Sequence, residues 1–212
     1  MLMVTIISRF FVFEFAATDS IYFNQNRPLI QKVGFVTFTR HSIIYQAMIS
    51  IVPAKLEELK YVQTIAQRTW PDTFGKILSP EQIDYMLGMM YSLETLEKQM
   101  VGGYQFFLAE EEGEKLGFSG IEVNNEPKKT KIHKIYILPR AQGKGIGKKL
   151  IQAIKEIALQ NDQKSLLLNV NKYNLGAIAF YEYVGFVNIK SEIIDIGNGY
   201  VMDDFLFEMK LF

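Results

Sequence analysis

The stretch that decides the fold reads Ile135-Tyr-Ile-Leu-Pro-Arg-Ala-Gln-Gly-Lys-Gly-Ile-Gly-Lys-Lys-Leu150. A short apolar run ends at Pro139, three glycines follow, and the pattern of an amphipathic helix begins at once. The first N–H groups of a helix have no partner inside it and lie at the positive end of its dipole, and glycine lets a phosphate approach them. Three lysines, at 144, 148 and 149, add positive charge. We therefore expect a strand, a turn and a helix that together bind a phosphate-bearing ligand.

The spacing of the glycines narrows the type of phosphate site. It does not fit a Walker loop, and the sixth position counted from Gly143 is Lys148, so a dinucleotide fingerprint also fails. The residues Gln142-Gly-Lys-Gly-Ile-Gly147 instead form a Q-x-x-G-x-G pattern. With Ile135–Pro139 before it, this pattern resembles the acetyl-CoA pyrophosphate loop of the GNAT N-acetyltransferase superfamily. The alternative, a glycine-rich connection without a ligand, is disfavoured because a plain turn has little use for three glycines and three lysines.

A second motif lies downstream at the spacing of the same superfamily. After an apolar run over 165–170, the chain reads Asn174-Leu-Gly-Ala-Ile-Ala-Phe-Tyr-Glu-Tyr-Val-Gly-Phe186. Asn174 is a good helix N-cap and Gly185 a good residue to end a helix. The segment resembles the GNAT pattern N-x-x-A-x-x-x-Y-x-x-x-G-F, which implies that Asn174 contacts the cofactor and that Tyr181 protonates the departing thiolate. Without the glycine loop, Tyr181 would read as an ordinary packing aromatic.

The resemblance also implies where acetyl-CoA binds. In that superfamily the strand equivalent to 131–138 splays away from the strand at 165–170, and the pantetheine arm enters between them. A backbone amide there polarises the acetyl carbonyl. The implied cofactor-binding residues are Ile135, Tyr136, Ile137, Gln142, Gly143, Lys144, Gly145, Ile146, Gly147, Lys148, Asn174 and Tyr181.

The composition excludes several other classes of protein. The 212 residues carry 23 basic and 23 acidic side chains, so the chain has no nucleic-acid footprint. It has no cysteine and only two histidines, which excludes a disulfide scaffold, a cysteine nucleophile and a histidine-rich metal cluster. No apolar run is long enough to span a bilayer. We expect a cytoplasmic enzyme without metal or membrane partner, and the sequence leaves open whether it forms a homodimer.

The pattern divides the chain at Met48. Residues 1–47 look unlike the rest, because their apolar start is broken by Arg9 and Glu14 and their remainder shows no periodicity. From Met48 the chain reads as a strand that runs into a helix, with Pro53 at the first helical position. We expect a GNAT domain over 48–212 and an extension over 1–47. The extension is either a mis-called translation start or an arm that packs on a neighbour.

The expected fold is α/β: a mixed, mostly antiparallel sheet with splayed central strands and flanking helices, as the resemblance implies. The expected helices cover 54–69, 146–160 and 174–184, with two more that begin after Ser79 and Ser92. The expected strands cover 104–110, 116–123, 131–138, 165–170, 186–190 and 204–211, with a polar loop at 124–130.

The expected reaction moves an acetyl group from acetyl-CoA to a primary amine. Without a cysteine to carry the acetyl group, direct attack in a ternary complex is the natural route, with Tyr181 as general acid. At the position equivalent to 133, many members of the superfamily have a glutamate that acts as the general base. This chain has His133 there, whose ordinary pKa near 6.5 suits a general base. Glu122 is a weaker candidate, and Asn169, at the other usual position, is no base at all.

The acceptor is left open between a small-molecule amine and a peptide or protein amine. Residues 69–74 are similar to the first interhelical segment of bacterial polyamine-type GNAT enzymes, and the acidic residues Asp195, Asp203 and Asp204 would attract a cationic amine. Two other functions compete: a non-catalytic regulator that binds acyl-CoA, which has no need of Tyr181, and a nucleotide-phosphate enzyme that uses the same loop.

Overall fold

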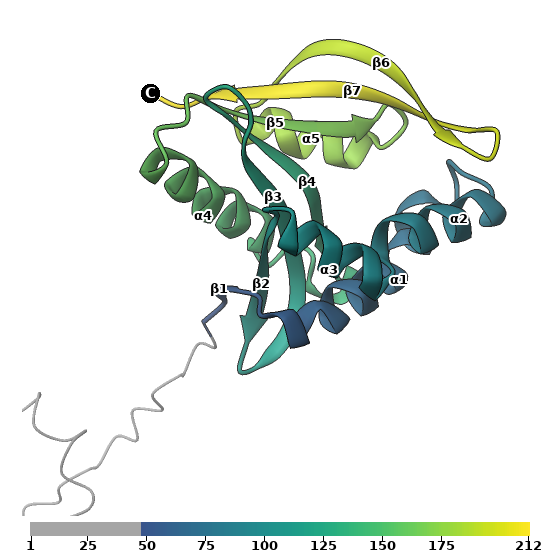
Figure 1. The fold of residues 1–212 in the computed structure, drawn as a ribbon, viewed down its shortest axis with the longest axis horizontal. Coiled ribbons are helices and arrows are strands. Elements are labelled where there is room, and N and C mark those ends of the chain that lie inside the picture. Colours follow the sequence, from purple (N-terminus) through teal and green to yellow (C-terminus); the bar gives the residue numbers. More distant parts are fainter. Residues whose placement is uncertain (1–47) are drawn as a thin grey trace, which may run out of the picture. The chain divides into compact units, whose positions relative to one another are not determined.

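The computed structural model describes residues 48–212, so the predicted extension over 1–47 lies outside the described residues (Figure 1). The strands are β1 (Ser50–Pro53), β2 (Gln105–Glu111), β3 (Glu114–Glu126), β4 (Lys129–Ile137), β5 (Ser165–Asn171), β6 (Val187–Gly197) and β7 (Tyr200–Lys210). The α-helices are α1 (Leu59–Phe74), α2 (Pro80–Tyr91), α3 (Leu93–Val101), α4 (Ile146–Gln160) and α5 (Leu175–Tyr183). Short 3₁₀ turns, η1 (Leu56–Glu58) and η2 (Pro139–Ala141), precede α1 and follow β4.

The described strands form one mixed sheet in the order β1-β2-β3-β4-β5-β7-β6. All neighbouring strands are antiparallel except the central pair, β4 and β5, which is parallel. Pairing between β4 and β5 runs from Lys129 with Ser165 to Ile132 with Leu168 and then stops, although β4 continues to Ile137. The two strands therefore splay apart toward their carboxyl ends, as expected. The predicted α/β fold, with its mostly antiparallel sheet and flanking helices, is confirmed.

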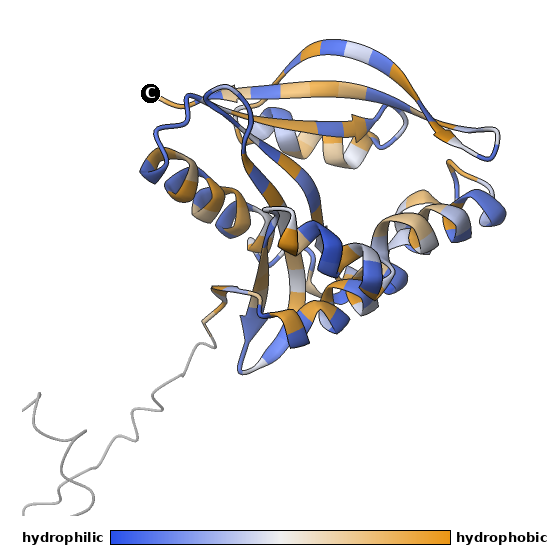
Figure 2. Ribbon diagram, viewed as in Figure 1, coloured by the Kyte–Doolittle hydropathy of each residue, from blue (hydrophilic) through white to orange (hydrophobic). Residues whose placement is uncertain are grey.

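Helices cover both faces of the sheet. Helices α1, α2 and α3 pack on one face of the β2–β4 half, while α4 lies across the other face and α5 packs behind β5 (Figure 1). Helix α4 buries Ile146, Leu150 and Ile154 and keeps its polar residues outward, as its apolar period predicts. Along β6, by contrast, hydrophilic and hydrophobic residues follow each other at short intervals, as in a strand with one covered face (Figure 2).

The first helix differs from the prediction. Pro53 ends β1 rather than opening a helix, and a 3₁₀ turn follows in which the Lys55 backbone N–H donates to Glu58 Oε2 at 3.0 Å. Helix α1 then runs to Phe74, past Pro71, which lacks the N–H for one helical hydrogen bond. Trp70 and Phe74 on either side of Pro71 are buried, and that packing outweighs the missing bond.

The strand boundaries differ at two hairpins. The predicted polar loop at 124–130 is wrong, because β3 extends to Glu126 and β4 begins at Lys129. The tight turn there is closed by Asn124 Oδ1, which accepts from the Lys128 N–H at 3.1 Å. The strands predicted at 186–190 and 204–211 are also longer: β6 and β7 form a hairpin around Asn198 and Gly199, both with positive φ. Two residues of this type are the usual short hairpin turn.

Candidate active site

The glycine turn has the backbone geometry of an anion site. Gly143 and Gly145 have φ of 80° and 78°, in the left-handed region that side chains rarely adopt. A Cβ built on either residue would meet nothing within 4 Å, so the backbone faces open space. Gly145 is the N-cap of α4, and the first-turn N–H groups therefore point into this space. The turn therefore leaves room for a phosphate group beside its backbone, and phosphate binding there stays a prediction.

The third glycine of the turn, Gly147, is needed for a different reason. A Cβ on Gly147 would lie 2.8 Å from Cζ of Phe180, so this glycine lets α4 and α5 pack closely.

The lysines around the turn also differ in placement. Lys148 lines the cavity and its Nζ donates to the Tyr183 hydroxyl at 2.7 Å. Lys144 instead forms an ion pair with Glu111 at 2.8 Å and is the one predicted site residue that does not line the cavity.

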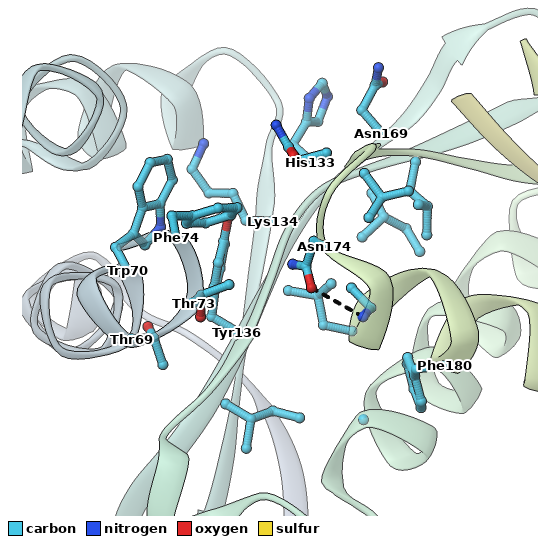
Figure 3. A pocket seen from close by; sticks show the side chains of 18 of the residues that line it. Thr69, Trp70, Thr73, Phe74, His133, Lys134, Tyr136, Asn169, Asn174 and Phe180 are labelled. Atoms are coloured by element: carbon cyan, nitrogen blue, oxygen red, sulfur yellow. Dashed lines mark hydrogen bonds between the residues drawn. The ribbon is translucent and has the colours of Figure 1, made fainter. Parts of the chain in front are cut away.

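A cavity of about 1040 Å³ opens between the splayed strands β4 and β5. The turn before α4 and the start of α5 border it on one side, α1 and α2 on the other, and the β6–β7 hairpin also reaches it (Figure 3). It brings together the other predicted site residues, which are His133, Ile135, Tyr136, Ile137, Gln142, Gly143, Gly145, Ile146, Gly147, Lys148, Asn174 and Tyr181.

Two residues of the second motif face this cavity from α5. Asn174 caps the helix, since its Oδ1 accepts from the Ala177 N–H at 3.2 Å, and its amide nitrogen remains for a ligand (Figure 3). Tyr181 is buried, with its ring against Phe186 at 5.7 Å between centroids. Burial raises the pKa of the Tyr181 hydroxyl, and the nearby Tyr136 raises it further. Tyr181 therefore holds its proton at physiological pH, as an acid requires.

An aromatic wall lines the same cavity. Tyr136 on β4 lies 6.0 Å from Trp70 and 6.1 Å from Tyr91, measured between ring centroids. Burial is the main cause that raises the pKa of Tyr136 to about 12. The indole Nε1 of Trp70 is buried and has no hydrogen-bond partner among the described residues. The segment 69–74, predicted to join two helices, instead forms the last turns of α1 and supplies this wall.

Sequence reasoning missed Lys134. It is only 6% exposed, and its Nζ lies over the rings of Tyr91 at 5.1 Å and Tyr104 at 5.7 Å. Burial lowers the pKa of Lys134 to about 8. Strand alternation places the side chains of Lys134 and Ile135 on opposite faces of the sheet, but only the structure shows that Tyr91 in α2 and Tyr104 after α3 cover Lys134.

His133 lies in an environment that disfavours its charge. Its Nε2 is 3.0 Å from Glu122 Oε2, and its ring stacks on Tyr104 at 4.4 Å. Burial is the main cause that lowers the pKa of His133, to about 4, against the opposing effect of Glu122. His133 is thus neutral at pH 7, and its proton affinity is low for a base.

The three acidic residues singled out in the sequence lie in different places. Asp195 is exposed and accepts the Gly197 N–H at 2.8 Å within the hairpin. Asp203 forms an ion pair with Lys172. Asp204 is buried and lines the cavity. Residues 48–212 hold no group of three metal-binding side chains and no helix that is long and apolar enough to cross a membrane.

Comparisons with known proteins agree on one family. The model of the acetyltransferase (GNAT) family matches residues 59–186. An uncharacterized N-acetyltransferase from the pepI 3′ region of Lactobacillus delbrueckii subsp. lactis is 26% identical over 157 residues, which cover 71% of this chain and 91% of the relative. The uncharacterized N-acetyltransferase YjgM of Escherichia coli K12 is 35% identical over 89 residues, and the match spans 41% of this chain and about half (53%) of YjgM.

Among solved structures, the PaiA N-acetyltransferase of Thermoplasma acidophilum in complex with coenzyme A has the same fold. Its TM-score is 0.66 at 24% identity, over 77% of this chain and 99% of that chain.

Proposed function

This chain belongs to the acetyltransferase (GNAT) family, and we propose that it transfers an acetyl group from acetyl-CoA to a primary amine by direct attack in a ternary complex. One observation carries the proposal: a single cavity between splayed strands joins the glycine turn to the buried hydroxyl of Tyr181. The names of the two curated relatives given above, both N-acetyltransferases, and the coenzyme A in the Thermoplasma structure support it.

The glycine turn is the proposed site of the pyrophosphate. The N–H groups from Gly143 to Lys148 would bind its oxygens, because Gly143 and Gly145 leave the backbone open and α4 presents its positive end there. The pantetheine arm would then run along β4 toward Ile135–Ile137, where β5 no longer pairs with the strand. The amide nitrogen of Asn174 would reach the cofactor from α5.

The reaction needs three events at the far end of this arm. The amine nitrogen forms a bond to the acetyl carbon, the bond from that carbon to sulfur breaks, and the sulfur leaves as a thiolate. A backbone N–H of β4 would stabilise the negative carbonyl oxygen. Tyr181 would give its proton to the sulfur and recover one from the amine through solvent. The support for this role is the position of the Tyr181 hydroxyl in the cavity, where it is protonated when the thiolate forms; its raised pKa makes it a weaker acid and does not itself favour the role.

Replacing Tyr181 with phenylalanine tests the proposal. The ring keeps its contacts with Phe186 and Phe207, so we expect unchanged affinity for acetyl-CoA and a turnover lower by roughly 10²-fold, the low end for a positioned acid because a thiol leaves readily. The measurement is CoA release with an amine acceptor, beside acetyl-CoA binding by calorimetry. Tyr173→Phe, at an exposed tyrosine before α5, is the matched control. A Tyr181→Phe variant with wild-type turnover, when chemistry limits the rate, would make Tyr181 a packing residue.

A further inference from the structure

Three carboxylates from β6 and β7 lie near the splayed end of β5, and two of them have partners of their own. Asp203 is paired with Lys172. Glu192 accepts from the Asn169 amide at 2.7 Å and forms an ion pair with Lys190 at 2.8 Å. The Nζ of Lys131 donates to the Oδ1 of the same Asn169 amide. The charges of this network are therefore compensated within the fold, with the exception of Asp204.

Asp204 is the carboxylate without a partner. It is 6% exposed, it lines the cavity, and no hydrogen bond or ion pair to it is formed by the described residues. Its place follows from register: Asp204 pairs with Asn171, the last residue of β5, beyond the point where β4 separates. A buried carboxylate that faces a cavity alone is unfavourable in an empty protein and favourable when a cation binds beside it.

Asp204 lines the same cavity as Tyr136 and Tyr181. Its charge contributes to the raised pKa of Tyr136, and the Tyr136 hydroxyl in turn influences Tyr181. The other groups that face it are Glu192 and Asp203, which repel its charge, and Lys131 and Lys172, which attract it. Asn169 and Tyr136 border the same space from β5 and β4 (Figure 3). A ligand that reaches Asp204 is therefore in the cavity that the proposed general acid also lines.

We propose that Asp204 binds the ammonium group of the acceptor and receives the proton that this group loses, so that the acceptor is a cationic primary alkylamine. This inference rests on the proposed function and names its substrate class. An ammonium that becomes an amide loses two protons: one ends on the CoA sulfur through Tyr181, and Asp204 passes the other to solvent. His133 is the poorer acceptor because Glu122 and Tyr104 already hold its ring.

The pKa of Asp204 is compatible with this role. Burial, and then Glu192 and Asp203, raise it to about 6. The carboxylate is therefore ionised at pH 7.5 and able to bind a cation, yet it takes up a proton more readily than an exposed aspartate does. Below pH 6 it is protonated, and kcat/KM for a cationic amine should fall.

The test compares Asp204→Asn with Asp203→Asn, which makes the same change at the neighbouring residue that is paired with Lys172. Each protein is given acetyl-CoA and unbranched alkylamines from ethylamine to hexylamine, together with their 2,2-difluoro analogues. The fluorinated amines have nearly the same size but a much lower ammonium pKa, so the assay is run at about pH 8.5, where they are largely neutral and the alkylamines remain cationic. We expect Asp204→Asn to lower kcat/KM for the alkylamines by about 100-fold, and for the neutral analogues by far less. Asp203→Asn should lower neither, and acetyl-CoA affinity should not change.

Three results would overturn the inference: an equal loss for both kinds of amine, no loss in Asp204→Asn, or a wild-type protein that acetylates peptide amines but no alkylamine. A wild-type protein that releases no CoA with any amine, peptides included, would contradict the proposed function itself. The two failures are thus distinguishable.

Discussion

The buried charge of Lys134 should lower the free energy of unfolding, and this effect can be measured directly. The lysine is 6% exposed, and burial alone lowers its pKa from 10.5 to about 8. The difference of about 2.5 pKa units corresponds to roughly 3 kcal/mol of destabilisation, at 1.36 kcal/mol for each unit. The contacts of Nζ with Tyr91 and Tyr104 offset on the order of 1 kcal/mol of this. We therefore expect Lys134→Met to raise the free energy of unfolding by about 2 kcal/mol at pH 7.

The pH dependence fixes the sign of the effect. The folded state lowers the pKa of Lys134, so the destabilisation is fully present below about pH 8, where the side chain is charged in both states. It decreases between 8 and 10.5 and vanishes above 10.5. The advantage of Lys134→Met should therefore shrink markedly from pH 7 to pH 9.5.

Urea unfolding of both proteins at the two pH values measures this difference, with Lys164→Met, at an exposed lysine, as the control. A methionine variant less stable than wild type at pH 7, or an advantage that does not change with pH, would refute the reasoning.

Two further predictions follow from the glycine turn and the domain boundary. Gly145→Val should weaken CoA binding at least about ten-fold, or 1.4 kcal/mol, because the side chain occupies the open space beside the amides. Gly113→Val controls for strain, since Gly113 has a similar φ of +84° and equally open surroundings outside the cavity; calorimetry that finds equal CoA affinity in both variants would remove the pyrophosphate from this turn. Deletion of residues 1–47 should leave the melting temperature and CoA affinity unchanged, because residues 48–212 form a seven-stranded sheet with its helices and hold all proposed site residues. A truncated protein that is insoluble or fails to bind CoA would place that segment in the fold.

The fold was predictable because its signals are local. The glycine turn, the N-cap Asn174 and the apolar period of α4 each depend on a few adjacent residues, and all three appear in the structure. Helix α1 was harder, because a proline inside a helix is tolerated only when packing compensates for it. The burial of Trp70 and Phe74 depends on α2, α3 and β4, which the local sequence does not specify.

The site was predictable in part for the same reason. Motifs identify Tyr181 and the glycine turn, but the roles of single residues depend on contacts between distant segments. Gly147 belongs to the motif, yet its tightest contact is with Phe180 on another helix. Asp203 and Asp204 are neighbours in sequence, and only the alternation of β7 and the position of Lys172 separate the paired carboxylate from the one in the cavity. The burial of Lys134 was missed for the same reason, because the sequence does not show that Tyr91 and Tyr104 cover its side chain.

Initial-rate kinetics of CoA release test the central claim, acetyl transfer by direct attack in a ternary complex. The concentrations of acetyl-CoA and of an alkylamine are varied together, and the mass of the protein is determined after incubation with acetyl-CoA alone. We predict intersecting reciprocal plots, CoA release that requires the amine, and an unmodified protein mass. Parallel plots with an acetylated protein would contradict direct attack, and the absence of amine-dependent CoA release would contradict acetyl transfer to an amine.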